Sequence, residues 1–460
     1  MGMEKTKWCT LLVVLLLCSS AAWGQSFSGT LPVVFIHTED TIASKTEYVG
    51  GTCYIDPMGN DEFEPMGSAG EPVPMLIRGR GNWTWFSEQF PKKPYKMKFE
   101  TKQSPLGMAK NKHFALLAHH DGVRAFFRNA AGFYLSRELK MDYTPAEQPV
   151  ELVLNGSYEG LYFLTETVRV GKHRVNIVEQ EDGETDADLV TGGWLVELDN
   201  AEDERQLVMP VGGTDLSWLW VTPHSPETLS TEQHDYLYHQ FEELLHRLYS
   251  AKKPVEGWEE MVDLSSLARY YVINEVLDHV EAFLGSCFMY KDWGEEAWKF
   301  GPLWDLGHAF NDWHPKNRFI YDVDGWPPCL IGQMMKLPQM QEAVERVWAE
   351  FYPRKYEGLV AFMTSYAERI SAAARCNAER WGVTNTADTQ VVLQNCLNLL
   401  SEKIDFLVSE WGNPLPIHVS SVTYRPKEEE RTYNLLGQPG RQDQRGIYIS
   451  GGRKWFGRRR

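Results

Sequence analysis

ARYYVINEVLDHVEAFLGSCFMYKDWGEEAWKFGPLWDLGHAF (residues 268–310) carries the most informative residue pattern of this chain. Its residue pattern predicts a helix, an acidic loop, two short strands joined by a turn, and a second loop after an apolar strand. Glu281 lies in the first loop, Ser286 follows five positions later, and Asp305 lies in the second loop. The hairpin is therefore preceded by an acid and a polar side chain and followed by a second acid.

These residues are typical of a phosphoryl-transfer site. Such chemistry requires a metal ion at the phosphates, cations on the non-bridging oxygens, and a carboxylate that orients the attacking hydroxyl. Protein kinases arrange these groups around a hairpin in the same order. In that order Glu281 is the catalytic acid, with Asp278 as an alternative, and Asp305 and Ser286 are the metal ligands. Asp305 suits Mg²⁺, which prefers one or two carboxylates plus phosphates and water, and a turn-capping role is the alternative.

Two of these residues differ from the usual kinase set. Glu281 is one methylene longer than an Asp, which shifts the geometry by about 1 Å and costs roughly a hundredfold in rate. Ser286 stands where kinases carry a metal-binding Asn, and a hydroxyl is a poorer ligand. The pattern leaves two interpretations open: an active phosphotransferase, or a nucleotide-binding protein with weakened turnover.

Cations for the phosphates are expected around the strand-forming segment PKKPYKMKF (91–99). Lys96 and Lys98 share one face of that strand, and the apolar residues between them point to the other face. The predicted phosphate ligands are Lys98, Lys96, Lys93 and Arg78. Lys98 also matches the catalytic lysine of kinases, with Glu138 on the next helix as its ion-pair partner. For any single lysine, a solvated basic strand face is the alternative.

Two further segments complete the predicted nucleotide site. Arg128 opens a helix predicted over 126–140 and is assigned to the phosphates, with a helix cap or an ion pair as the alternative. Leu164 to Thr167, which includes Glu166, follows the strand GLYF and would form the hinge whose backbone faces adenine. The loop IRGRGN lacks G-x-G-x-x-G spacing and is not a nucleotide fingerprint.

Charge and cysteine content narrow the class of partner. The chain of 460 residues carries a formal net charge of −17, and its last part, 422–460, is basic, so the body is strongly acidic. An acidic body argues against nucleic acid as a partner, because a phosphate backbone requires a basic surface. A nucleotide is compatible with it, since a few local cations and Mg²⁺ meet its charge. The five cysteines beyond residue 24 show no C-x-x-C spacing, which favours buried thiols over a zinc site.

The N-terminal segment MGMEKTKWCTLLVVLLLCSSAAWGQS reads as a signal peptide over residues 1–24. Lys5 and Lys7 precede an apolar run that is too short to span a bilayer, and Ala22-Trp23-Gly24 forms a small-x-small cleavage site. Lipoprotein processing usually requires a small residue before the cysteine, and Cys18 follows three leucines, so a lipid anchor there is disfavoured. We expect a secreted or cell-envelope protein without a transmembrane helix.

Strand patterns dominate residues 25–200, including a hairpin around Asn155-Gly156, and helical patterns dominate residues 201–421. Helices are expected over about 232–249, after Asp263 as an N-cap, over 338–374 and over 389–411. This organisation predicts an α+β, bilobal protein-kinase-like fold with a strand-rich N-terminal lobe, a helical C-terminal lobe and a small C-terminal β-tail.

The tail, residues 422–460, contains YNLLGQPGRQDQRGIYISGGRKW and ends in RRR. It resembles the C-terminal sorting-type β-segments of proteins exported by Bacteroidetes, in which a YNLxGQ segment precedes GIYI and a basic end. A small β-appendage that caps the domain or stays mobile is the alternative.

Several motifs together resemble the spore-coat protein H (CotH) kinase-like family, in its secreted Bacteroidetes-type form. They are IRGRGNWTW (77–85), PKKPYKMKF (91–99), PLGMAKNKHFALLA (105–118), FFRN (126–129), NGSYEGLYFLTETVRVGKHRVNI (155–177), SCFMYKD (286–292) and KFGPLWDLGHAF (299–310). The resemblance covers roughly residues 31–312. It implies a kinase-like fold and phosphorylation of Ser or Thr in an exported protein, with ATP and Mg²⁺ or Mn²⁺. Gly307 replaces the second acid of the family's W-D-x-D, and Glu281 replaces the Asp of its N-x-D segment.

A carbohydrate-active protein is a further interpretation. Export, an acidic surface and tryptophans near the predicted site favour it: Trp83, Trp85, Trp293 and Trp304. A glycosidase needs two carboxylates at a defined separation, and Glu281 with Asp305 would supply them. The pattern between these acids fits a kinase better.

Overall fold

The computed structural model of the chain describes residues 27–199, 206–211, 218–251, 254–326 and 329–414, together with three short strands in the tail. The chain divides into two compact units, Met1–Asn413 and Pro414–Arg460. The predicted signal peptide, residues 1–24 with Cys18, lies outside the described residues. None of the helices in the described ranges combines the length and apolar character needed to cross a membrane.

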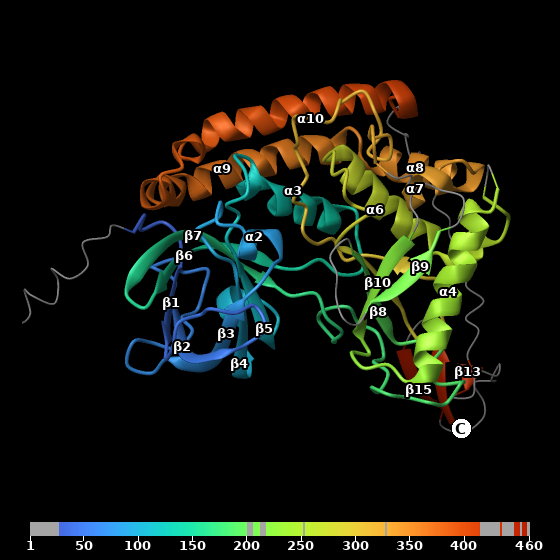
Figure 1. Ribbon diagram of the computed structural model, residues 1–460, viewed down its shortest axis with the longest axis horizontal. Helices are drawn as coiled ribbons and strands as arrows, with labels where there is room; N and C mark the ends of the chain where they lie inside the picture. The colour runs from blue at the N-terminus through green and yellow to red at the C-terminus, as the bar shows by residue number, and fades with distance from the viewer. Residues whose placement is uncertain are drawn as a thin grey trace, which may run out of the picture. The chain divides into compact units, whose positions relative to one another are not determined.

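Seven strands of the first unit form a closed barrel (Figure 1). In barrel order they are β1 (Val33–Thr38), β2 (Val49–Asp56), β3 (Val73–Gly79), β4 (Tyr95–Gln103), β5 (Asn111–Leu117), β7 (Ser157–Glu166) and β6 (Glu147–Leu154). Neighbouring strands are antiparallel, except that β6 closes the barrel by pairing in parallel with β1. The closing register places Val33 opposite Glu151, so the closure joins segments that are far apart in the sequence.

Alternation of side chains along each strand explains the barrel interior. On β4 the apolar Met97 and Phe99 are buried, and Lys96 and Lys98 point outward, as predicted. Inward residues from all seven strands form one apolar cluster that fills the barrel. Polar side chains able to bind a ligand must therefore lie on the outer face of the barrel or at its ends. The predicted turn at Asn155-Gly156 is confirmed, and both residues have positive φ, 51° and 80°, as a type I′ turn requires.

Helices cover one side of the outer barrel surface. Helix α3 (Ala125–Glu138) contacts α9 (Arg354–Trp381), and α9 contacts β7. The outward residues Leu117 and Phe163, from β5 and β7, are buried in the main hydrophobic core with these helices. The outer face of β3 and β4 carries charged side chains instead, which remain partly or fully exposed: Arg78, Lys96 and Lys98.

A second sheet lies beyond the barrel in the sequence. Its order is β12 (Lys299–Phe300), β11 (Cys287–Lys291), β8 (Trp194–Asp199), β10 (Trp218–Ser225) and β9 (Leu207–Pro210), and all neighbouring strands are antiparallel. Strands β11 and β12 are the hairpin predicted in the opening stretch, with Met289 opposite Phe300. The strands before and after α4 (Thr231–Tyr249) thus meet in one sheet.

The remaining helices follow their capping and breaking signals. Asp263 caps α6 (Leu264–Val276) by accepting a hydrogen bond from Ser266 N at 2.6 Å, as predicted. The helix predicted over 338–374 is two helices, α8 (Pro338–Phe351) and α9, because Pro353 interrupts the pattern. The others are α2 (Trp83–Phe86), α5 (Trp258–Met261), α7 (Leu330–Met334), α10 (Thr389–Trp411) and the short η1 (Pro105–Gly107) and η2 (Thr384–Thr386).

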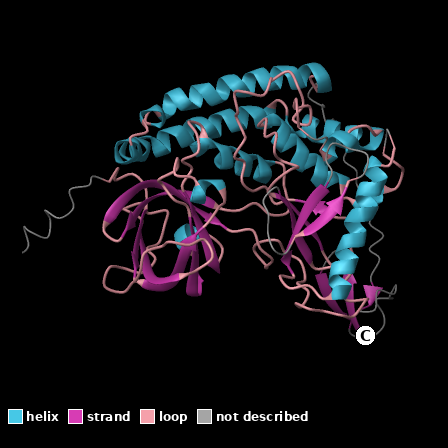
Figure 2. Cartoon of the chain, in the orientation of Figure 1, coloured by secondary structure: helices cyan, strands magenta, loops and turns pink. Residues whose placement is uncertain are grey.

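The predicted bilobal protein-kinase-like fold is wrong, although the chain does mix helices and strands. Figure 2 shows the strands of the first unit in two separate groups, which are the closed barrel and the second sheet. The region predicted as a helical lobe contributes β9 to β12, and α3, from the predicted strand-rich lobe, packs with α6 and α9. Periodicity shows which residues of a strand are apolar, but it does not show which distant strand pairs with it.

The second unit contains a three-stranded antiparallel sheet in the order β13 (Tyr433–Asn434), β14 (Gly446–Ser450) and β15 (Arg453–Gly457). Strands β13 and β14 coincide with the YN and GIYIS parts of the predicted tail pattern. The sorting role assigned to this tail stays a prediction.

Candidate functional site

The hairpin β11–β12 carries a predicted metal ligand at each of its two outer ends. Because its strands are antiparallel, Ser286, just before β11, and Asp305, beyond β12, leave the hairpin at the same end. Both residues have positive φ, 50° and 52°. Non-glycine residues enter this region at a cost of about 1–3 kcal/mol, and such strain clusters at functional sites. The Asp305 side chain is exposed to solvent.

Helix α3 holds the loop that carries Asp305. The Asn129 side-chain oxygen accepts a hydrogen bond from Leu306 N at 3.2 Å, and Arg128 Nε donates to Ala309 O at 3.2 Å. A Cβ on Gly132 would lie 2.5 Å from the Leu306 side chain, so a larger residue here would force Leu306 to move. Arg128, predicted as a phosphate ligand, also pairs with Asp121 at 2.9 Å. It thereby joins the loop before α3 to the loop after β12.

Four charged groups from distant segments act on the Asp305 carboxyl. Desolvation by the surrounding protein raises its pKa, and the negative charges of Asp121 and Glu197 raise it further. The positive charge of Arg80, and a smaller effect of His119, oppose this rise. A carboxylate in such surroundings gains from a cation, because the cation would offset both the desolvation and the repulsion.

Arg80 connects the barrel to the second sheet. It follows β3, and its guanidinium lies over the Trp304 ring with 5.5 Å to the ring centroid. The charges of Asp305 and Glu197 favour its ionised form against the cost of burial. Its guanidinium forms no hydrogen bond with another described residue. Glu197, on β8, pairs with His224 on β10 at 2.6 Å between Oε2 and Nε2.

Three cations form a group on the outer surface of the barrel beside Arg80, here called the cationic face. They are Arg78 on β3 and Lys96 and Lys98 on β4. Arg78 lies opposite Lys96, and Lys98 lies opposite His113 in the sheet register. Burial, followed by the charges of Arg78, Arg169 and Arg80, lowers the pKa of Lys96 to about 8. Burial and the same kind of repulsion lower the pKa of His113 to about 3. Within the described residues, Lys96 forms no hydrogen bond or ion pair.

The structure brings together only part of the predicted phosphate set. Arg78, Lys96 and Lys98 share the cationic face, although Arg78 also donates to the carbonyl oxygens of Lys45 and Gly79. Lys93 donates instead to the carbonyls of Trp85 and Ser87, at 2.7 and 3.1 Å. Glu138 is exposed at the end of α3, and none of the ion pairs among the described residues joins it to Lys98.

Glu166, predicted in the hinge, lies in a buried polar cluster. It is 3% exposed and pairs with Arg174 at 2.5 Å. Tyr143 and the backbone N–H groups of Ala109 and Ala146 donate further hydrogen bonds to its carboxylate. These contacts occupy the carboxylate, so its side chain has a structural role at the end of β7.

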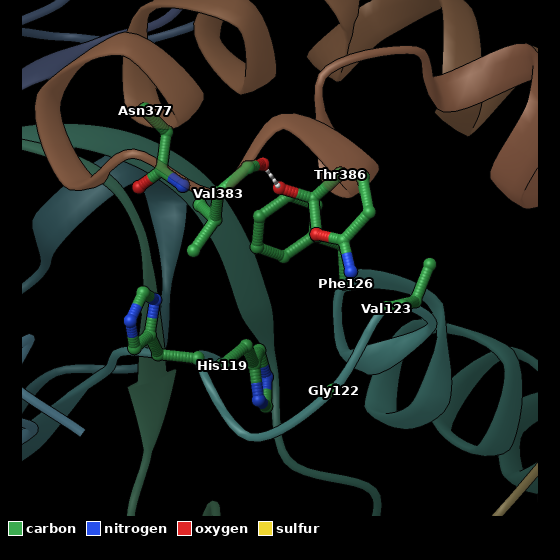
Figure 3. A pocket seen from close by; sticks show the side chains of 9 residues that line it. His119, Gly122, Val123, Phe126, Asn377, Val383 and Thr386 are labelled. Carbon is green, nitrogen blue, oxygen red and sulfur yellow. Dashed lines mark hydrogen bonds between the residues drawn. The ribbon is translucent and has the colours of Figure 1, made fainter. Parts of the chain in front are cut away.

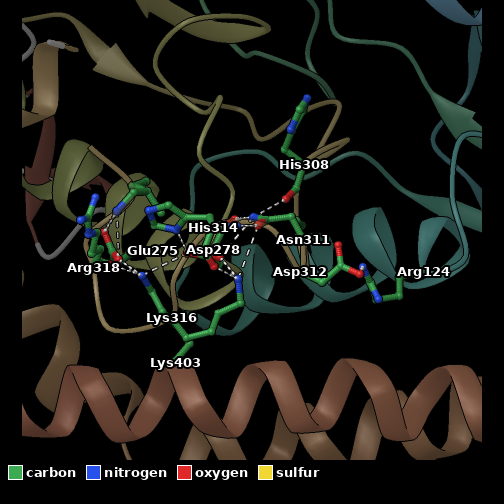
Figure 4. Close-up of polar contacts among 12 residues, drawn as sticks. Arg124, Glu275, Asp278, His308, Asn311, Asp312, His314, Lys316, Arg318 and Lys403 are labelled. Carbon is green, nitrogen blue, oxygen red and sulfur yellow. Dashed lines mark hydrogen bonds and ion pairs between the residues drawn. The ribbon is translucent and has the colours of Figure 1, made fainter. Parts of the chain in front are cut away.

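Asp278, the alternative catalytic acid, lies in a buried charge network (Figure 4). Its carboxylate contacts His314 at 2.8 Å, Lys316 at 2.5 Å and Lys403 at 3.2 Å. Burial would raise its pKa, but the hydrogen bond from His314 and the charges of both lysines lower it to about 2. Lys403 also pairs with Glu275 at 2.5 Å. The network joins α6 and α10 to residues 311–320, and Asp278 is only 2% exposed.

Glu281, the other acid of this loop, faces a histidine. Its Oε2 lies 3.3 Å from Nε2 of His308, with side-chain exposures of 28% and 39%. His308 is three residues beyond Asp305, so its contact with Glu281 connects the loop of the predicted catalytic acid to the loop of the predicted metal ligand. The structure thus places Glu281 near the Asp305 loop and Asp278 away from solvent.

A cavity of about 160 Å³ lies between the loop after β5 and the end of α9 (Figure 3). Its lining residues are His119, His120, Gly122, Val123, Phe126, Asn377, Val383, Asn385 and Thr386. Pockets that bind ligands of nucleotide size measure about 300–1,000 Å³, so this cavity is too small for a nucleotide. His119, one of the lining residues, also acts on the charge of Asp305.

Among the described residues, no group of three or more His, Cys, Asp or Glu side chains is arranged to hold a metal ion. Mg²⁺ bound with a nucleotide needs only one or two carboxylates, because phosphates and water complete its coordination. The exposed Asp305, with Glu197 close enough to act on its charge, has donor chemistry that fits Mg²⁺ or Mn²⁺.

Sequence reasoning missed three residues of this region: Arg80, Glu197 and His308. Two of them, Arg80 and Glu197, have a weak signal in the sequence. Arg80 follows Arg78 by two positions and so continues the same strand face, and Glu197 is an acid within the apolar strand WLVELD. His308 gives no signal by itself, because only the fold brings Glu281 to it.

Comparison with known proteins adds one finding. A family model described as CotH kinase protein matches residues 77–400, which is more than half of the chain. The match contains the cationic face, Glu281, Ser286 and Asp305. No curated protein matches the chain significantly.

Proposed function

The chain belongs to the CotH kinase protein family, and from this premise we propose that it transfers the γ-phosphoryl group of ATP to a Ser or Thr hydroxyl of an exported protein, with Mg²⁺ or Mn²⁺. One observation supports this proposal above the others. The half-buried Arg80 and Lys96 form no hydrogen bond with other described residues; Arg80 acts on the exposed carboxylate of Asp305, and the charge of Arg80 acts in turn on Lys96.

The cations suit a polyphosphate. The repulsion that lowers the pKa of Lys96 would be relieved by an anion placed among Lys96, Arg78 and Arg80. Charge-assisted hydrogen bonds from guanidinium and ammonium groups are the stronger kind, and they orient phosphate oxygens. The whole chain carries a formal net charge of −17, so the cationic face is a positively charged region of an otherwise acidic protein.

The acids suit the metal and the acceptor. Asp305 would hold the divalent cation, with Ser286 at the same end of the hairpin, and the cation would neutralise charge on the transferred phosphoryl group. Glu281 would orient the acceptor hydroxyl from the neighbouring loop. Asp278, three residues before Glu281, anchors this loop through its buried ion pairs with Lys316 and Lys403.

Binding and transfer are tested separately. Titration calorimetry with ATP and Mg²⁺ or Mn²⁺ should show metal-dependent binding to the wild type. Asp305→Asn should abolish the metal dependence, and Arg80→Met or Lys96→Met should weaken affinity by about 10- to 100-fold, the value of a charge-assisted hydrogen bond. Lys102→Met, an exposed lysine on the same strand β4, is the matched control and should bind as the wild type does. A wild type that binds no nucleotide with either metal would refute the proposal.

A second candidate function is nucleotide-dependent binding or envelope assembly with little turnover. The observation that favours it is the acid content of the site: Gly307 lacks a carboxylate, and Asp278 is buried, which leaves Glu281 alone in its loop. Transfer of label from γ-labelled ATP to dephosphorylated casein separates the two functions. Binding without transfer, at any pH from 6 to 9, would favour this second function.

The sugar-binding alternative receives less support from the described side chains. Trp304 lies under Arg80, and Trp83, on α2, is 66% exposed but forms an edge contact with Phe90. Export remains part of the proposal through the predicted signal peptide, and detection of the mature protein outside the cytoplasm would test it.

A further inference from the structure

The pair Glu281–His308 is the one acid–histidine contact of the described residues that joins the two loops of the predicted site. The contact measures 3.3 Å, and both side chains remain partly exposed. A macromolecular acceptor can therefore reach the imidazole. The acid–histidine pairs elsewhere join other elements, such as Glu197 with His224 in the second sheet.

The backbone that carries His308 is held at several points. Leu306 N donates to Asn129, Ala309 O accepts from Arg128, and Phe310 N donates to Leu277 O at 2.8 Å. These bonds lie on both sides of His308, so its position relative to Asp305 is defined by the fold. Three residues span at most about 10 Å between Cα atoms, and less in the turn observed here.

Aromatic contacts define the orientation of the His308 ring. Trp313 and Trp326 meet it edge-on, with centroid distances of 6.2 and 6.3 Å and interplanar angles of 90° and 75°. His279 lies on another side at 6.5 Å. Burial, followed by the charges of His308 and Arg128, lowers the pKa of His279 to about 3, so His279 is neutral near pH 7. Glu281 is then the charged group in contact with His308.

We propose that His308 accepts the proton of the acceptor hydroxyl during phosphoryl transfer, and that Glu281 fixes its tautomer and stabilises the imidazolium. This inference rests on the proposed function. The hydroxyl oxygen forms a bond to the γ-phosphorus, the bond from the γ-phosphorus to the β–γ bridging oxygen breaks, and ADP leaves with that electron pair. The proton passes to the imidazole nitrogen that does not face Glu281, and then to water.

This assignment explains the two departures of the site from the usual acids. An acid that orients a histidine works through a different geometry from an acid that contacts the hydroxyl itself, so the extra methylene of Glu281 is tolerated. Gly307 provides no second carboxylate, and His308, the next residue, supplies a proton acceptor instead. A positioned general base contributes about 10²- to 10⁴-fold in rate.

The first test needs no nucleotide. The imidazole resonances of the full-length protein are titrated by ¹H–¹⁵N NMR, and His308→Gln identifies the His308 signal. Glu281→Gln should change the ring ¹⁵N chemical shifts of His308, which report the nitrogen that carries the proton, because the variant removes the carboxylate that contacts Nε2 at 3.3 Å. Glu296→Gln, which removes an exposed acid of the β11–β12 turn, is the control and should leave the signal unchanged. Unchanged ring ¹⁵N chemical shifts of His308 in Glu281→Gln would overturn the proposal.

The second test measures transfer from γ-labelled ATP to dephosphorylated casein. His308→Gln should lower kcat by about 10²- to 10⁴-fold, keep nucleotide affinity within about twofold, and lose the acidic limb of the pH–rate profile. Glu281→Gln, as the second variant, should shift that limb to lower pH instead of removing it. Transfer by His308→Gln within threefold of the wild type, with the same pH profile, would overturn this inference alone. Absence of nucleotide binding by the wild type would overturn the proposed function and this inference together.

Discussion

Lys403→Met should destabilise the first unit strongly, although Lys403 lies on α10, outside the predicted site. The lysine is fully buried, and its ammonium contacts Glu275 at 2.5 Å, Asp278 at 3.2 Å and the carbonyl oxygen of Arg318 at 2.6 Å. Methionine keeps most of the packing volume but leaves the Glu275 carboxylate without its cation. Breaking a buried ion pair from one side costs about 3–5 kcal/mol.

The expected shift in melting temperature follows from the size of the unit. Unfolding entropy of about 2.1 cal/mol/K per residue gives about 0.8 kcal/mol/K for the roughly 370 described residues of this unit. A loss of 3–5 kcal/mol therefore corresponds to a decrease of about 4–6 °C in Tm, measured by differential scanning fluorimetry at a fixed scan rate. Lys102→Met, at an exposed position, is the control and should change Tm by less than about 1 °C.

The destabilisation should also depend on pH in a defined direction. Burial raises the pKa of Glu275, and Lys403 opposes that rise, so the variant raises the pKa of Glu275 further. A carboxyl whose pKa is raised by folding stabilises the folded state below its unfolded pKa, and that contribution is lost as pH rises through the folded pKa. The decrease in Tm should thus be larger at pH 7.5 than at pH 5, and Glu275→Gln in the same chain should restore part of it at pH 7.5. A decrease below 1 °C at pH 7.5, or a larger decrease at pH 5, would refute the reasoning.

Three further predictions concern the site and its support. Nucleotide affinity should fall as pH rises through about 8, because the ammonium of Lys96 loses its proton there. Lys96→Met should remove that fall when affinity is measured at pH 7 and pH 9. An equal fall in the variant would contradict the role of Lys96. Asn129→Ala should cost about 1–3 kcal/mol in chemical denaturation, since Leu306 N loses its acceptor in a buried setting, and a cost below 0.5 kcal/mol would contradict this. Gly132→Ala should destabilise the first unit by about 1–3 kcal/mol through overpacking against Leu306. Alanine in place of glycine normally stabilises a helix by about 1 kcal/mol, so a rise in Tm would refute the close packing.

Local features of the fold were predictable because their causes are local. The cap at Asp263, the Asn155-Gly156 turn and the outward face of Lys96 and Lys98 depend on residues within a few positions of one another. The break between α8 and α9 was missed even though its cause, Pro353, is local as well. The type of each element could therefore be predicted from the sequence more readily than the arrangement of the elements in space.

The arrangement of the site depended on contacts between distant segments. Arg80 reaches the Asp305 site because the end of β3 approaches the loop after β12, where its guanidinium lies over Trp304, and no spacing in the sequence encodes that approach. Asp278 and Glu281 are three residues apart, yet one is buried among lysines and the other faces His308. Residue type alone did not distinguish these two acids.

The acids around the hairpin, the cationic strand face and the family could all be predicted from the sequence, because each depends on the order of residues or on a short period. Only the tertiary structure decided that the strands close into a barrel, that Asp305 is exposed beside Arg80, and that His308 meets Glu281. The physical reason is that strand closure and charge pairing depend on which distant segments meet. That choice is made by the packing of the whole unit, through side chains whose partners lie far away along the chain.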